Sequence, residues 1–128
     1  MRVLLDTHAF LWWVLEDPRL SAGARNQIAA PETDVVVSAV SAWEIAIKAA
    51  DRRLDLPEPA QTYVPDRIVA NGFRELHVTA EHAVGVAGLP PIHRDPFDRL
   101  LVAQAQVEGI PIVTSDPSIA KYEVEVIW

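Results

Sequence analysis

The sequence of 128 residues contains no cysteine, and only two of its 11 basic residues, Lys48 and Lys121, are lysines. Without cysteine the chain forms no disulfide bond and no thiolate metal site, and this composition favours a reducing compartment. Long apolar runs are also missing. The run over residues 9–15 is too short to span a membrane, and Asp6 and His8 interrupt the apolar N-terminus that a signal peptide would need. We therefore expect a cytoplasmic protein with no membrane partner.

Positive charge is scarce: the 18 acidic residues outnumber the 11 basic ones and give a net charge of −7. Proteins that hold nucleic acid chiefly through its phosphates are usually basic, so this charge disfavours a simple nucleic-acid-binding module. It is compatible with an enzyme whose carboxylates are neutralised by bound cations. Half of the residues are hydrophobic and 23% are charged, which is typical of a globular protein, and the length fits one domain over residues 1–128.

Helix-like and strand-like segments alternate along the chain. Short β-branched runs predict strands, and longer amphipathic segments with caps predict helices. The expected strands cover residues 2–5, 34–37, 74–78, 110–114 and 123–127; the expected helices cover 8–16, 21–30, 41–53 and 96–108, with others ending at Asn71-Gly72 and beginning after Thr79, and a helical turn over 115–120. This alternation predicts an α/β fold with a mostly parallel central sheet of about four to five strands and helices on both faces.

Four acidic residues are expected at one edge of this sheet. Asp6, Glu44 and Asp116 come directly after predicted strands or in the helix that follows, and Asp98 opens the helix that leads into the fourth strand. Ligands of open parallel sheets bind outside the carboxyl ends of the strands. The four carboxylates therefore form a candidate site.

Three of these acids also have a structural interpretation as helix caps. Asp6 fits the N-cap of the first helix, and Asp116 precedes a proline, as a cap often does. Ser41 and Glu44 have the spacing of a capping box, in which the glutamate reaches back to the serine amide.

A similar alternative applies to the two acids around Pro96. Asp95 is a good N-cap before this proline, and Asp98 then lies in the first turn, where the helix dipole favours an anion. Four like charges in one pocket destabilise one another, however, and serine or asparagine would cap equally well. We therefore favour a cation site for Asp6, Glu44, Asp98 and Asp116, and a cap for Asp95.

Carboxylates without cysteine or closely spaced histidine pairs are hard oxygen ligands. They suit Mg²⁺ or Mn²⁺ better than Zn²⁺. Such an ion polarises a phosphoryl oxygen and activates water near neutral pH, so the site indicates phosphate chemistry. His8 and His93 flank the site in the sequence, but isolated histidines are more often structural, and we assign neither a role.

Four motifs give the chain a family resemblance. The segments are "LLDTHAFLW" (4–12), "SAVSAWEIAIK" (38–48), "HRDPFDRLLVAQA" (93–105) and "IVTSD" (112–116), and the match continues to the closing "YEVEVIW" (122–128). In this order and spacing they resemble the PIN-domain toxins of the VapC type, over essentially the whole chain.

The resemblance implies a Rossmann-like sheet and an endoribonuclease that hydrolyses RNA phosphodiester bonds with water activated by Mg²⁺ or Mn²⁺. It also implies a toxin neutralised by a cognate antitoxin, and a homodimer. The acidic positions of the family fall on Asp6, Glu44, Asp98 and Asp116, and its polar residue near the fourth acid corresponds to Thr114 or Ser115. Which RNA is cut does not carry over.

The first helix contains only apolar residues over 9–15. Covering a sheet needs only one apolar side, so the other side either packs within a small protein or forms a contact with a partner. Tryptophan is enriched at interface anchors, and the resemblance implies dimers and antitoxin grooves. We therefore predict Phe10, Trp12 and Trp13 as a partner interface, with burial in the core as the alternative.

Arg94 and Arg99 adjoin the proposed site, and the planar guanidinium suits phosphate. Arg99 is thus a candidate supporting residue that contacts RNA. The alternative is a salt bridge to Asp95 or Glu108.

Two other functions compete with an RNA-cleaving enzyme. A phosphoacceptor signalling domain of the receiver type also has an acidic Mg²⁺ pocket, but it needs adjacent acids after the first strand and a lysine after the last core strand. Asp6 stands alone here, and Ser115-Asp116 includes no lysine. A catalytically inactive PIN module for protein interactions is the other alternative, and the four intact acids disfavour it.

Overall fold

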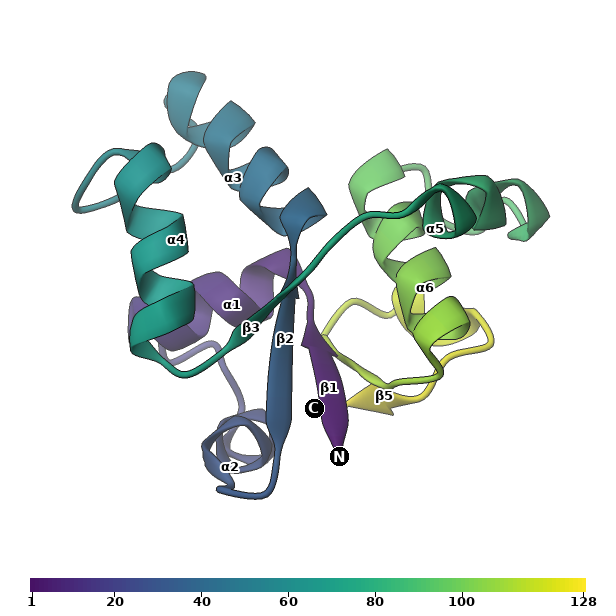
Figure 1. Cartoon of the computed structure of the whole chain (residues 1–128), viewed down its shortest axis with the longest axis horizontal. Coiled ribbons are helices and arrows are strands. Elements are labelled where there is room, and N and C mark those ends of the chain that lie inside the picture. Colours follow the sequence, from purple (N-terminus) through teal and green to yellow (C-terminus); the bar gives the residue numbers. More distant parts are fainter.

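The central sheet of the computed structural model, which describes all 128 residues, is built from five parallel strands. They are β1 (Arg2–Leu5), β2 (Asp34–Ser38), β3 (Arg74–Leu76), β4 (Ile112–Val113) and β5 (Val126–Ile127), in the spatial order β3-β2-β1-β4-β5 (Figure 1). All four neighbouring pairs are parallel. The predicted α/β fold with a parallel sheet is confirmed.

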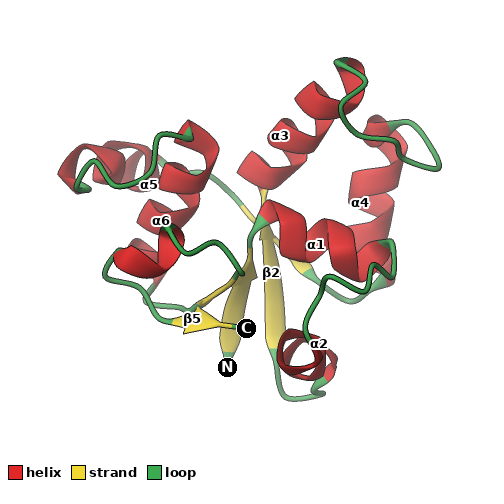
Figure 2. Cartoon of the chain, turned by 180° about the vertical axis from the view of Figure 1, so that it is seen from behind, coloured by secondary structure: helices red, strands yellow, loops and turns green.

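Helices cover both faces of this sheet. They are α1 (Thr7–Val14), α2 (Ala22–Ala29), α3 (Ala39–Ala50), α4 (Ala60–Ala70), α5 (Ala80–Gly85) and α6 (Pro96–Glu108), with 3₁₀ turns η1 (Val86–Gly88) and η2 (Ile119–Lys121). Figures 1 and 2 show α1, α2 and α4 on one side of the strands and α5 and α6 on the other. None of the helices combines the length and apolar character that crossing a bilayer requires.

The strands are buried on both faces, which explains their continuous apolar runs. In β1, Val3 and Leu5 belong to the core cluster beneath α1, α2 and α4, whereas Leu4 belongs to the cluster beneath α6. In β4, Val113 and Ile112 divide in the same way. The alternation of side chains along a strand therefore builds two cores on one short sheet.

The helix α6 has the predicted bounds. Asp95 is its N-cap, and one carboxylate oxygen accepts from the backbone N–H of Phe97 at 2.8 Å, while Pro96 occupies the first turn. At the other end Gly109 adopts a left-handed conformation with φ of 66°, which glycine tolerates without a steric cost. The cap interpretation of Asp95 is confirmed.

The start of α3 differs from the prediction. The helix begins at Ala39, directly after β2, and Ser38 is its N-cap through a 3.0 Å hydrogen bond that its side chain accepts from the N–H of Val40. The predicted start at Ser41 is wrong, because Ser41 lies within the helix and is fully buried. Strand β4 is also shorter than the predicted span 110–114, and the helical turn covers 119–121 instead of 115–120.

Candidate active site

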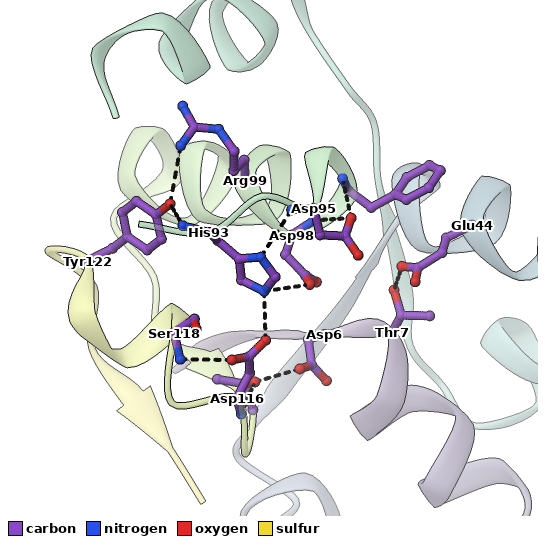
Figure 3. Close-up of polar contacts among 12 residues, drawn as sticks. Asp6, Thr7, Glu44, His93, Asp95, Asp98, Arg99, Asp116, Ser118 and Tyr122 are labelled. Atoms are coloured by element: carbon purple, nitrogen blue, oxygen red, sulfur yellow. Dashed lines mark hydrogen bonds and ion pairs between the residues drawn. The ribbon is translucent and has the colours of Figure 1, made fainter. Parts of the chain in front are cut away.

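The predicted acids gather at the carboxyl edge of the sheet around β1 and β4 (Figure 3). The chain passes from β1 to β2 and β3 on one side and then returns to place β4 on the other side of β1. The boundary between β1 and β4 is therefore the topological switch point, where ligands of such sheets bind. Asp6 follows β1, Asp116 follows β4, and Asp98 lies in the first turn of α6.

Asp6 is fixed by hydrogen bonds to both carboxylate oxygens. Oδ1 accepts from the N–H of Ala9 at 2.7 Å, so Asp6 is the N-cap of α1 as predicted, and Oδ2 accepts from Oγ1 of Thr114 at 2.5 Å. Thr114 in turn accepts from the N–H of Asp116 at 3.0 Å. Burial raises the pKa of Asp6 above its ordinary value, and the hydrogen bonds from Thr114 and Ala9 oppose this rise. The cap function of Asp6 is therefore compatible with a role at the candidate site.

His93 connects the other two acids of this edge. Its Nε2 lies 2.8 Å from Oδ2 of Asp116 and 3.0 Å from Oδ2 of Asp98. The backbone N–H of Asp95 donates to Nδ1 at 3.1 Å, so Nδ1 carries no proton and Nε2 does. His93 therefore donates a hydrogen bond to Asp116 while the same nitrogen lies close to Asp98, and it holds α6 and the segment after β4 together.

The same tautomer decides which atoms could bind a cation. One atom each of His93, Asp98 and Asp116 lies within 4.8 Å of the others, a spacing that metal ligands also show. A nitrogen that keeps its proton has no lone pair for a metal ion, however. The carboxylate oxygens are the candidate ligands, and the imidazole orients them, as outer partners of metal ligands do.

The charges at this edge are incompletely compensated. Burial, followed by the negative charges of Asp95 and Glu44, raises the pKa of Asp98 to about 7, although His93 opposes the rise. The pKa of Asp116 is lowered: burial alone would raise it, but the hydrogen bonds from His93 and the N–H of Ser118 outweigh that effect. A carboxyl group that resists ionisation in this way indicates a place where a cation would be bound favourably.

Glu44 lies beside this group and not within the set of closely spaced atoms. Its side chain is buried, and it accepts from Oγ1 of Thr7 at 2.7 Å and pairs with Nζ of Lys48 at 2.6 Å. The predicted capping box with Ser41 is wrong, because Oγ of Ser41 lies 3.0 Å from Thr7 and the cap of α3 is Ser38. Glu44 is thus held by Thr7 of α1 and by Lys48 of its own helix.

The side chain of Arg99 contacts residues of its own chain next to the candidate site. Its guanidinium donates to the carbonyls of Pro90 at 2.9 Å and Val86 at 3.2 Å, and to the hydroxyl of Tyr122 at 3.2 Å. That hydroxyl also accepts from the N–H of His93 at 2.8 Å. The guanidinium is engaged by the chain itself, and the alternative of a salt bridge to Asp95 or Glu108 is wrong.

The structure also places the remaining predicted residues, Thr114, Ser115, Phe10, Trp12 and Trp13. Thr114 contacts Asp6, whereas Ser115 is exposed, so Thr114 is the polar residue of the site. Phe10 is fully buried in the core, and its prediction as an interface residue is wrong because it faces the sheet. Trp12 and Trp13 are partly buried, and their role at an interface stays a prediction.

His93 is the site residue that the sequence did not reveal. Its partner Asp116 is 23 residues away, and only the fold brings them together. The one available signal was the position of His93 immediately before the "RDPFD" segment, which is too general to indicate a role.

Comparisons with known proteins place the chain in a family. The sequence profile of the PIN domain matches residues 3–125, so the chain belongs to the PIN-domain family. Within it the chain is similar to VapC proteins. It is 34% identical over 115 residues to ribonuclease VapC22 of Mycobacterium tuberculosis, covering 89% of this chain and 86% of that protein. It is 45% identical over 69 residues to ribonuclease VapC16 of the same organism, covering 51% and 49%.

Solved structures show the same fold at low sequence identity. VapBC2 from Rickettsia felis, bound to a DNA fragment from its promoter, superposes with a TM-score of 0.73 at 13% identity and covers 98% of this chain and 97% of that one. A toxin–antitoxin complex from Klebsiella pneumoniae gives a TM-score of 0.67 at 15% identity, with 98% and 96% covered.

Proposed function

We propose that this protein is an endoribonuclease that depends on Mg²⁺ or Mn²⁺ and acts as the toxin of a toxin–antitoxin pair in the cytoplasm. The observation that carries the proposal is the convergence of Asp6, Asp98 and Asp116 at the switch point of the sheet, with a pKa of about 7 at Asp98. The relatives VapC22 and VapC16, both named ribonucleases, support the choice of RNA as substrate.

The donor set fits a hard divalent cation. Carboxylate oxygens of Asp98 and Asp116 would bind the cation, and Asp6 and Glu44 would be additional carboxylate ligands. The chain has no cysteine that could supply a thiolate ligand. When bound, Mg²⁺ or Mn²⁺ neutralises the phosphate and supplies an activated water. The chain itself orients the carboxylates: His93 donates to Asp116 and lies 3.0 Å from Asp98, while Thr114 and the N–H of Ala9 hold Asp6.

An antitoxin and a second copy are the proposed protein partners. The similar solved structures include a toxin–antitoxin complex, which supports an antitoxin for this chain. The acidic pocket would be neutralised by a basic side chain of that partner, because a cation of any kind relieves the repulsion among its carboxylates. We place the contact with the partner protein at the C-terminal end of α1. Trp12 and Trp13 lie there, and the following Leu15 is 38% exposed.

Two isosteric substitutions three residues apart test the catalytic role. Asp98→Asn removes a proposed ligand and should reduce cleavage of total RNA by roughly 100-fold or more, because loss of even an outer partner of a metal ligand costs about 10- to 100-fold. Asp95→Asn should keep most of the activity, because asparagine caps a helix as well as aspartate does. Equal activity of both variants would show that Asp98 is only a helix residue and would refute the proposal.

A further inference from the structure

An aromatic pair, Trp43 and Phe97, connects the N-terminal half of α3 with the first turn of α6. The side chain of Trp43 is 61% exposed, which makes it the most exposed aromatic residue of the chain. Its ring lies 5.0 Å from the ring of Phe97, edge to face at 79°. Edge-to-face packing is a favoured arrangement of two aromatic rings, so Phe97 fixes the orientation of the tryptophan while a large part of its surface stays open to solvent.

This pair stands at the border of the acidic site. Trp43 directly precedes Glu44, and Phe97 directly precedes Asp98. Both helices begin at the carboxyl edge of the sheet (Figure 1). Successive residues of a helix point about 100° apart, so Glu44 faces inward to Thr7 while Trp43 faces outward beside it. The nucleotide next to a phosphate at the acidic site would therefore lie near the exposed part of Trp43.

The charge of the chain makes such a contact valuable. The net charge of −7 disfavours contact with the RNA backbone. Two of the basic residues near the site, Arg99 and Lys48, are engaged with the chain's own groups, and Arg94 is the exposed basic residue beside it. Aromatic side chains bind nucleic acid without positive charge, because every base offers a π-face for stacking.

The geometry points to Trp43, held by Phe97, as a stacking position for an unpaired RNA base beside the phosphate that is cleaved. The inference rests on the proposed ribonuclease function and names the part of the substrate that this surface recognises. A base within a duplex is already stacked, so the enzyme should prefer single-stranded segments and loops.

The test compares three variants on three RNA substrates. The substrates are a single-stranded oligonucleotide that the parent protein cuts, and two versions in which the nucleotide on one or the other side of the cut lacks its base. The variants are Trp43→Ala, Trp43→Phe and Val84→Ala, the last being a control because Val84 is 71% exposed on α5 and outside the site.

We expect Trp43→Ala to lower kcat/KM on the intact oligonucleotide by about tenfold, mainly through KM, as the loss of one base–aromatic contact does. Trp43→Phe should retain most of the parent's value, and Val84→Ala all of it. On one of the two abasic substrates the parent and Trp43→Ala should differ by less than about twofold, because the contact is then missing in both.

Several results would overturn the inference. A loss that is equal on all three substrates would mean that Trp43→Ala damages the site as a whole, and a changed Mn²⁺-induced rise in Tm would identify that damage. No loss on any substrate, with or without weaker antitoxin binding, would show that Trp43 does not stack on RNA. If the parent protein cuts no RNA at all, that result refutes the proposed function, and this inference is refuted with it.

Discussion

Replacing Asp98 by asparagine should stabilise the metal-free protein at neutral and alkaline pH. Burial raises the pKa of Asp98 to about 7, well above its ordinary value of 3.8. Between these two pH values the unfolded chain releases the proton while the folded chain keeps it, so the free energy of unfolding of the parent falls as the pH rises. Above pH 7 the folded protein carries the full cost of the charged Asp98, and the asparagine variant does not.

The size of this effect follows from the pKa. A rise from 3.8 to about 7 sets a ceiling of about 4 kcal/mol. Two effects reduce it. The repulsion is shared with Asp95 and Glu44, and asparagine loses the favourable interaction of a carboxylate with the first turn of α6, about 0.3–1 kcal/mol. We expect a net gain of about 1–3 kcal/mol at pH 8, or roughly 4 °C in Tm per kcal/mol.

Thermal and urea unfolding in EDTA at several pH values between 4 and 8 would measure this difference. The gain should disappear near pH 4, and the control Asp66→Asn, an exposed acid on α4, should show no comparable trend. Mn²⁺ should raise the Tm of the parent more than that of Asp98→Asn, because it binds only the assembled site. A variant that is less stable than the parent at pH 8, with an equal Mn²⁺ shift, would mean that Asp98 only stabilises the first turn of α6.

Two further predictions concern residues around the site. His93→Ala should weaken Mn²⁺ binding by about tenfold in calorimetry, because Asp116 loses its hydrogen-bond donor and Asp98 its neighbouring imidazole. His93→Gln should restore part of the binding, and stronger or unchanged binding would refute the orienting role. Trp12→Ala and Trp13→Ala should weaken antitoxin binding or dimerisation, measured by calorimetry and sedimentation. If both variants leave affinity and oligomeric state unchanged, the two rings belong to the chain's own packing, in which Trp12 stacks on His8 at 5.4 Å and Trp13 donates to Asn71 at 3.0 Å.

Local signals were sufficient where the chain determines its own geometry. The span of α6 could be predicted because Asp95 and Pro96 start it and Gly109 ends it, all within the segment itself. The two-sided burial of β1 and β2 could be predicted from their continuous apolar residues. The position of the acids at one edge followed from the alternation of strands and helices.

Tertiary contacts explain what the sequence did not reveal. The Ser41 to Glu44 spacing suggested a capping box, but Glu44 is held by Thr7 from another helix and by Lys48. The contact between Thr7 and Glu44 joins residues 37 positions apart, so no local sequence pattern predicts it. The role of His93 likewise depends on a tertiary contact, the hydrogen bond to Asp116, which lies 23 residues further along the chain. Phe10 was misassigned because a helix that is apolar on all sides does not reveal which side faces the sheet.

Cleavage of RNA by the purified, partner-free protein, with and without divalent ions, tests the central claim most directly. The account predicts cleavage with Mg²⁺ or Mn²⁺, none in EDTA, and recovery when Mn²⁺ is added back. Hydrolysis by an activated water should leave a 5′-phosphate and a 3′-hydroxyl at the cut. Cleavage that persists in EDTA, or products that end in cyclic phosphates, would contradict it.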